Sequence, residues 1–144
     1  AQTRPCPRRI RTPRIVEGHG ARQPEHIHVK GQTVIFLSPQ EAQKKYAILD
    51  AANDVATFSV ELLRQQEEEL NSSFLDRYLR SSRDRTDMKP LLPVYQMYAA
   101  LRLGVTSCEM RTAMAWTEEE REAFQQRAVQ YFNIAVRFAR QLPH

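Results

Sequence analysis

Apolar residues recur at every third or fourth position along most of the chain after residue 38, which is the spacing of one helix face. The pattern is clearest from Thr117 onward, where acidic residues fill the first predicted turn and arginines the last, as the helix dipole favours. We expect this C-terminal helix to pack one continuous face against the first helix of the domain. Its predicted packing residues are Phe124, Tyr131, Phe132 and Phe138, in a seam with Ala128, Ala135, Ala139 and Leu142.

A second helical pattern begins at the sequence SPQE, residues 38–41, which places a capping serine before a proline and an acid in the first turn. Apolar residues then follow at helical spacing as far as Leu70. The next three residues, Asn71-Ser72-Ser73, offer a break or a new cap. We therefore expect a long helix from Pro39, a further apolar face after the break, and a polar linker over Ser81–Pro90.

The region after this linker predicts two short helices that meet at Gly104. The first begins near Pro93 and ends at Gly104, a residue type that favours helix C-termini. Residues Thr106–Glu109 resemble a capping box that opens a short helix to about Ala115, and Thr117–Glu120 is another that opens the last helix. We therefore expect a tight corner between residues 99 and 116.

The same corner has the spacing of a helix-turn-helix, with a small residue, a turn glycine and apolar packing positions. In that interpretation, residues 106–111 would face the major groove of DNA. Against it, Glu109 cancels the charge of Arg111, and the other exposed positions there carry no cation. A corner with a structural role has the same spacing and is the favoured interpretation.

Two short segments before the helical region have the composition of strands. The sequences HIHV and QTVIFL flank Lys30-Gly31 and predict a small hairpin or a single bent strand. No later segment has a strand pattern. The apolar run of residues 34–37 must therefore dock on the helices or add to the sheet of another chain. The predicted partner-binding residues of this extended element are Val34, Ile35, Phe36 and Leu37.

These patterns together predict an all-α fold, a bundle of about four to five helices with an N-terminal extended basic arm and a short β-like segment. The chain has 144 residues, of which 42% are apolar, which suits one modest domain. We expect residues 1–37 to form the arm with its short extended element, and residues 38–144 to form the helical domain. The longest uncharged stretch has 12 residues, whereas a membrane-spanning helix needs about 20.

Positive charge is concentrated in the arm. The whole chain has a net charge of +4, yet residues 1–37 alone hold seven Lys and Arg against two Glu. The other 107 residues carry 14 basic and 15 acidic side chains, so the helical domain lacks the basic excess of a nucleic-acid-binding body. The predicted partner-binding arginines of the arm are Arg4, Arg8, Arg9, Arg11, Arg14 and Arg22.

The Pro- and Arg-rich arm, over residues 1–25, cannot bury enough apolar surface to offset the entropy of its own ordering. We expect a partner to order it, either an acidic protein surface or the phosphates of a nucleic acid such as RNA. The alternative is that the arm folds back onto the helical domain.

No catalytic, cofactor or metal site is predicted. Three histidines, His19, His26 and His28, lie close to Glu25, and their spacing resembles the start of a cupin metal motif. The resemblance stops there, because Gln32 stands where the acidic ligand belongs and the second motif is missing. Runs of glutamate cannot converge on one substrate atom, since consecutive helical residues point about 100° apart. The two cysteines are expected to be reduced or unpaired.

The sequence therefore predicts a non-catalytic accessory or structural subunit of a large multisubunit assembly, anchored to other protein subunits by its arm. The sequence starts without methionine, which fits removal of a targeting peptide or simple methionine removal equally, and its Arg-rich, acid-poor start suits the flank of a mitochondrial presequence. We expect a mitochondrial or otherwise intracellular protein, for example in a respiratory-chain complex, an ATP synthase or a ribosome. The alternative is a nucleic-acid-binding protein that uses the arm and the corner at residues 99–116.

Overall fold

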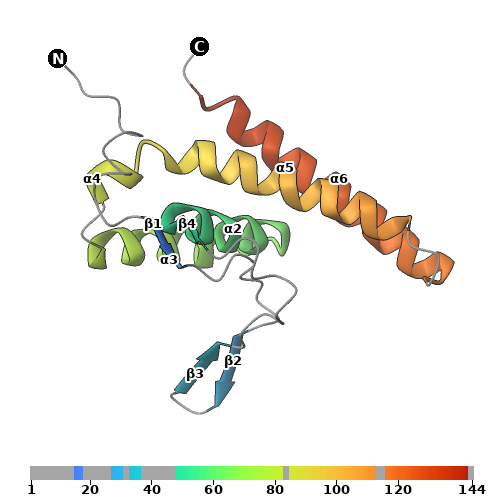
Figure 1. Cartoon of the computed structure of the whole chain (residues 1–144), viewed down its shortest axis with the longest axis horizontal. Coiled ribbons are helices and arrows are strands. Elements are labelled where there is room, and N and C mark those ends of the chain that lie inside the picture. The colour runs from blue at the N-terminus through green and yellow to red at the C-terminus, as the bar shows by residue number, and fades with distance from the viewer. Residues whose placement is uncertain are drawn as a thin grey trace.

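The computed structural model describes residues 15–17, 27–30, 33–36, 48–82, 85–112 and 116–142. This part of the chain is mainly helical, so the all-α class predicted for the folded region is confirmed (Figure 1). Strands occur among the described residues only as two short two-stranded ribbons. The helices are α2 (Ala51–Arg64), α3 (Glu68–Ser81), α4 (Arg85–Met88), α5 (Leu92–Arg111) and α6 (Glu118–Ala139).

The predicted hairpin is present as strand β2 (Ile27–Lys30) paired antiparallel with β3 (Thr33–Phe36). A second ribbon, which the sequence did not predict, pairs β1 (Ile15–Glu17) antiparallel with β4 (Ile48–Asp50). This pairing crosses the predicted domain boundary at residues 37 and 38. It therefore joins part of the arm to the chain immediately before α2.

The predicted helix through Leu49 is wrong, because β4 occupies residues 48–50 and α2 begins at Ala51. The predicted cap at Ser38 lies outside the described residues. Asp50 caps α2 instead: its backbone is extended and its Oδ1 accepts a hydrogen bond of 2.9 Å from the Ala52 amide. Leu49 fits the helical spacing by position, but the strand pairing and the cap decide its conformation.

The predicted break at Asn71-Ser72-Ser73 is also wrong, because these residues lie inside α3. The turn falls earlier, at Gln66, whose φ of 64° is in the left-handed region. The Gln66 amide donates to the Leu63 carbonyl and the Glu67 amide to the Leu62 carbonyl, which is a Schellman motif. Glycine normally marks this position, so a glutamine there removes the usual sequence signal for the end of a helix.

The predicted polar linker over Ser81–Pro90 contains the short helix α4, and Met88 within it is completely buried in the core. The core lies where α2 packs against α5 and the C-terminal half of α6. Its buried members are Ala52, Val55, Ala56, Val60, Met88, Leu92, Ala99, Ala100, Leu103, Tyr131 and Ala135.

The helix that begins near Pro93, as predicted, does not end at Gly104. It continues to Arg111 as the single helix α5, so the predicted corner and the capping box at Thr106–Glu109 are both wrong. The reason is tertiary: a Cβ atom on Gly104 would lie 2.7 Å from Cε1 of Phe132 on α6. Glycine in a helix interior costs about 1 kcal/mol relative to alanine, and here it makes room for that ring.

The capping box at the start of α6 is confirmed, since the Glu120 amide donates to Thr117 Oγ1 at 3.3 Å and the Thr117 amide donates to Glu120 Oε2 at 2.8 Å. Of the predicted seam, Ala128, Tyr131, Ala135 and Phe138 are buried. The seam packs chiefly along α5, and its C-terminal half also contacts α2, the helix that the sequence predicted as its partner.

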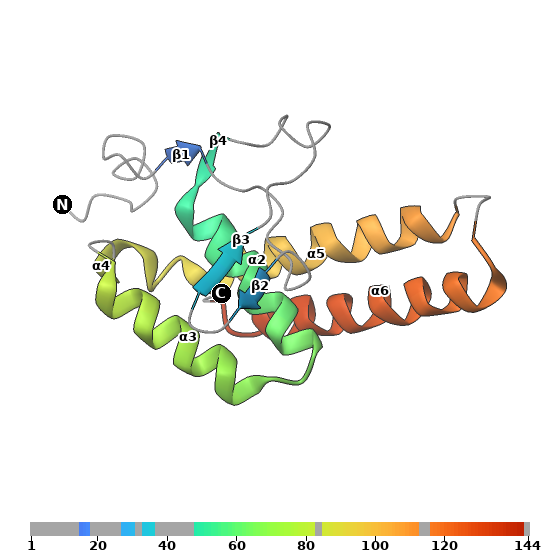
Figure 2. The same ribbon diagram turned by 90° about the horizontal axis from the view of Figure 1, so that it is seen from below.

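Helices α5 and α6 run antiparallel as a long hairpin that extends well beyond α2 and α3 (Figure 2). Helix α5 has 20 residues and α6 has 22, whereas α2 and α3 have 14 each. No helix in the described part of the chain is long and apolar enough to cross a membrane. Because the hairpin extends beyond α2 and α3, the described helices surround its free end on fewer sides than its base.

Candidate interaction surface on the α5–α6 hairpin

A buried ionic cluster joins α2 to α6 at the base of the hairpin. The Tyr131 hydroxyl donates to Glu61 Oε1, and Arg64 Nε donates to Glu61 Oε2 at 3.1 Å. Glu61 is 1% exposed, so its charge is compensated within the protein. Burial raises the pKa of the Tyr131 hydroxyl well above its usual value, and the hydrogen bond to Glu61 raises it further.

Arg64 also lies over the Tyr131 ring, with its Cζ 5.7 Å from the ring centroid. Burial lowers the pKa of the Arg64 guanidinium, but its attraction to Glu61 outweighs this and the net pKa is raised. Both oxygens of the Glu61 carboxylate are thus engaged by groups of the same chain. The cluster holds helices together and presents no carboxylate oxygen to a substrate.

A second buried network joins three helices. The Ser59 hydroxyl on α2 donates to Asn71 Oδ1 on α3 at 2.7 Å, and Gln96 Nε2 on α5 donates to Ser59 Oγ at 2.7 Å. A third contact comes from Tyr95, whose hydroxyl donates to Asp50 Oδ2 at 3.0 Å. These bonds fix α5 against α2, and they satisfy polar groups rather than leaving them for a ligand.

The described residues contain no group of three or more His, Cys, Asp or Glu that could hold a metal ion. His19 and His26, two of the histidines whose spacing resembles the start of a cupin metal motif, lie outside the described residues. Cys108 is a free, exposed cysteine on α5. Within the described part of the chain, the polar clusters named above therefore join helices to one another.

Large apolar side chains are exposed along one side of the hairpin. Leu101 and Val105 on α5 are 43% and 50% exposed, and Val129 and Val136 on α6 are 53% and 49% exposed. On each helix these residues share a face by their spacing, and the contact between Gly104 and Phe132 joins the two faces. We call this set the hairpin face: Leu101, Gly104, Val105 and Cys108 of α5, with Val129, Phe132 and Val136 of α6.

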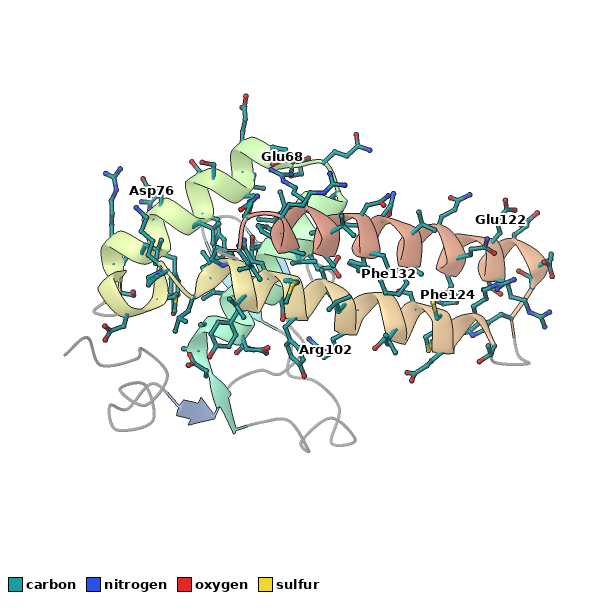
Figure 3. The ribbon with its side chains drawn as sticks, turned by 90° about the horizontal axis from the view of Figure 1, so that it is seen from above. Glu68, Asp76, Arg102, Glu122, Phe124 and Phe132 are labelled. Atoms are coloured by element: carbon teal, nitrogen blue, oxygen red, sulfur yellow. The ribbon has the colours of Figure 1, made fainter. Side chains whose placement is uncertain are left out.

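The hairpin face lies on the side of α5 away from α2. Gln96 faces α2, since it donates to Ser59 there. At 100° per residue, Leu101 lies about 140° and Val105 about 180° around the helix from Gln96. Figure 3 shows Phe132 between the two helices, with Arg102 directed away from the pair. Helix α5 is therefore apolar on two opposite sides, of which one is packed against the other described helices.

The hairpin face itself holds no charged residue, while α6 has opposite charges at its two ends. Glu118 and Glu122 lie near its start, and Arg137 and Arg140 near its end. Figure 3 shows Glu122 at the free end of the hairpin. Arg137 makes a two-pronged ion pair with Glu68 of α3, with Nη1–Oε1 at 2.5 Å and Nη2–Oε2 at 3.3 Å.

The exposed apolar area has an energetic consequence. Full burial of a Val or Leu side chain contributes about 1.5–3 kcal/mol, so covering four half-exposed ones would contribute roughly 3–6 kcal/mol. Association costs an estimated 4–15 kcal/mol in lost freedom of motion. A partner that binds here must therefore cover more of the hairpin than these four side chains.

The predicted site residues have different positions relative to this surface. The arm arginines and Leu37 lie outside the described residues, and Val34, Ile35 and Phe36 lie in β3. Tyr131 and Phe138 are buried, whereas Phe132, which belongs to the hairpin face, is half-buried. Phe124 is half-buried beside Trp116, with their ring centroids 5.2 Å apart.

Sequence reasoning missed the exposed apolar residues of α5. Val94, Tyr98, Leu101 and Val105 alternate steps of four and three, which is the signal of a helix face. Gly104 favours helix C-termini, so the sequence predicts two short helices there, and this spacing does not stand out as one continuous face. Comparison with family models, with curated proteins and with solved structures found no match to this chain.

Proposed function

We propose that this protein is a non-catalytic accessory subunit of a multisubunit assembly and that it binds protein through the hairpin face. The observation that supports this best is the apolar face of Leu101, Val105, Val129 and Val136 on a hairpin that extends beyond the rest of the domain. Exposed apolar patches of this kind mark interaction sites in soluble proteins. The buried polar clusters are engaged within the chain, which favours a binding role over catalysis.

The arm belongs to the same proposal. Its six arginines provide charge-assisted hydrogen bonds for an acidic protein surface, which would add contacts beyond the hairpin face. Its Arg-rich, acid-poor composition also supports a mitochondrial assembly. The alternative, a nucleic-acid-binding protein, is less favoured. Its predicted helix-turn-helix corner needs a turn at Gly104, whereas residues 99–111 form one continuous helix.

The test is affinity purification of the full chain from its native source, with nuclease treatment and mass spectrometry. Val129→Lys places a charge on the hairpin face, and Gln130→Lys places the same charge on an exposed position outside it. We expect a nuclease-resistant set of proteins that is recovered with Gln130→Lys and is reduced at least tenfold with Val129→Lys.

Two results would contradict the proposal. If recovery of the other proteins disappears after nuclease treatment, the chain binds a nucleic acid rather than a protein surface. Equal recovery with Val129→Lys and Gln130→Lys would show that the hairpin face does not bind the assembly. A parallel version lacking residues 1–25 measures how much the arm contributes to the same recovery.

A further inference from the structure

We infer that the hairpin face binds one amphipathic helix of another protein, which lies between α5 and α6 and runs in the same direction as α5. This inference rests on the proposed function, because it names the kind of partner that the same surface binds. It is carried by the spacing of the uncovered residues on each helix, by the register of the two helices, and by the charges that border them.

The uncovered residues follow one spacing on both helices. They form a row on α5, Tyr98, Leu101, Val105 and Cys108, and a row on α6, Val129, Phe132, Val136 and Ala139. Steps of three and four alternate in both rows and average 3.5 residues, which is the repeat of a coiled-coil seam. A seam of this kind favours a helix as its occupant, because a helix with the same repeat follows it turn after turn.

The two rows lie level with each other along the antiparallel pair. A Cβ atom on Gly104 would contact the Phe132 ring, so Val105 and Phe132 lie at about the same height on their helices. Counting from this pair in opposite directions gives three further pairs: Tyr98 with Ala139, Leu101 with Val136, and Cys108 with Val129. A helix laid between the rows therefore contacts both α5 and α6 at each of its turns.

Both rows face away from α2. The row on α5 lies opposite Gln96, which bonds to α2. On α6, Tyr131 bonds to Glu61 of α2 and lies about 160° around the helix from Val129. The two rows therefore lie on the same side of the hairpin, where a third helix can reach both.

The size of this surface fits one helix. Ten residues separate Tyr98 from Cys108, so the four pairs span about 15 Å along the hairpin. Axes of packed helices lie about 8–10 Å apart, so the rows enclose on the order of 150 Å² in outline. This is far below the roughly 800 Å² that each partner buries in a standard interface. The surface therefore receives about three turns of one helix, and further contacts, such as those of the arm, must add to the affinity.

Charged residues at the two ends of the rows select the direction of the bound helix. Glu109 and Glu122 border the free end of the hairpin, whereas Arg102 and Arg140 border the half nearer its base. The helix dipole favours acidic residues in the first turn of a helix and basic residues in the last. A helix with these charges brings its basic end to the two glutamates only if it starts at the base, parallel to α5. The complementary partner is therefore an amphipathic helix with an acidic start and a basic end.

Two labelled synthetic peptides of about 18 residues test this choice by fluorescence anisotropy with the full chain. Both carry leucines in alternating steps of three and four. One has three glutamates at its start and three lysines at its end, and the other has these charges exchanged. We expect the first to bind with a dissociation constant of roughly tens of micromolar at low salt, and the second at least about fivefold more weakly.

Variants of the full chain separate contact with the hairpin from the helicity of the peptides. Val129→Lys should weaken binding of the first peptide at least roughly tenfold, while Gln130→Lys should leave it unchanged. Glu109→Lys combined with Glu122→Lys should remove the preference between the two peptides. Circular dichroism confirms that each variant keeps its helices.

Photocrosslinking tests the direction with the partner itself. A photoreactive amino acid replaces either Tyr98 or Cys108 in the full chain, which is then purified with its assembly after irradiation. Crosslinks from both positions should fall in one segment of a partner protein whose apolar residues follow steps of three and four. Position 98 should crosslink nearer the start of that segment and position 108 nearer its end.

The inference would be overturned if neither peptide bound at millimolar concentration, if both bound equally, or if the crosslinks ran in the opposite order. A dimer in light scattering that Val129→Lys converts to a monomer would instead assign the face to a second copy of this chain. If no peptide binds but recovery of the assembly depends on Val129, the proposed function stands and this inference fails. If the first peptide binds as expected but recovery does not depend on Val129, the helix site stands and the proposed function fails.

Discussion

Tyr131 on α6 donates a hydrogen bond to the carboxylate of Glu61 on α2, a residue 70 positions earlier in the chain. Tyr131 is 4% exposed and Glu61 is 1% exposed, so the bond lies inside the protein. It fixes the base of the α5–α6 hairpin against α2. The exposed face of the hairpin is thereby held on a rigid support.

Removing the hydroxyl with Tyr131→Phe should destabilise the protein. Glu61 Oε1 would lose its donor inside the core, which costs about 1–3 kcal/mol in free energy of unfolding. Urea unfolding at neutral pH measures the change. Tyr98→Phe is the control, because Tyr98 is exposed on α5 and should shift the free energy of unfolding by less than about 0.5 kcal/mol. Equal effects of the two substitutions would contradict this prediction.

Alkaline pH should weaken the folded state through the same residue. An unfolded tyrosine ionises near pH 10, while burial keeps the pKa of folded Tyr131 above that value. The stabilisation is complete below about pH 10 and is lost as the pH rises further, by up to about 1.4 kcal/mol per pH unit.

Urea unfolding at about pH 9 and about pH 11, on either side of that ionisation, checks this effect. The difference in free energy of unfolding between the native chain and Tyr131→Phe should narrow at the higher pH. A difference that stays constant would show that Tyr131 titrates normally in the folded state.

Gly104→Ala should be destabilising although alanine is the better helix former. The new Cβ would lie 2.7 Å from the Phe132 ring, and forcing the ring away costs about 1–3 kcal/mol, against a gain in helix propensity of about 1 kcal/mol. In a Phe132→Ala background, the same substitution should become stabilising. Thermal unfolding of all four proteins gives the coupling, and additive effects would contradict the contact.

Phe138→Ala should cost about 3–5 kcal/mol, because the ring is 6% exposed and its loss leaves a cavity. Val129→Ala on the exposed side of the same helix should change the free energy of unfolding by less than about 0.5 kcal/mol. Urea unfolding compares the two variants. A near-neutral Phe138→Ala would move the predicted seam from the core to an interface.

Asn71→Ala should destabilise the protein by about 1–3 kcal/mol, since the buried Ser59 hydroxyl would lose its acceptor. Ser72→Ala is the matched control, because Ser72 is the next residue on α3 and is exposed. Hydrogen exchange should show faster opening of α3 in the first variant only. If both variants behave alike, the Ser59–Asn71 bond contributes nothing to the docking of α3.

Much of the fold could be predicted from patterns a few residues long. The Thr117–Glu120 capping box and the buried seam of α6 follow from residues that lie within one or two turns of each other. The β2–β3 hairpin follows from two strand-like segments separated by a turn signal. In each case the interacting groups are close in the sequence, so the sequence contains both partners.

The failed predictions share a different cause. Asn71 resembles a break until Ser59, itself bonded to Gln96, is brought against it, and Gly104 resembles a helix end until the Phe132 ring fills its space. Gln66 ends α2 without the expected glycine. The hairpin face could have been found from the spacing of Leu101 and Val105, but only once α5 was known to continue past Gly104.

Local patterns in the sequence predict the helical class, the Thr117–Glu120 capping box and the inward seam of α6, because these depend on hydrogen bonds and spacing within a helix turn or two. Tertiary structure alone decided where helices stop, which polar groups are satisfied and which apolar residues are left outside. Val105 and Leu103 have similar side chains on one helix, yet Val105 is 50% exposed and Leu103 is 6% exposed. Burial depends on which distant segments pack against a residue, and no local pattern contains that information.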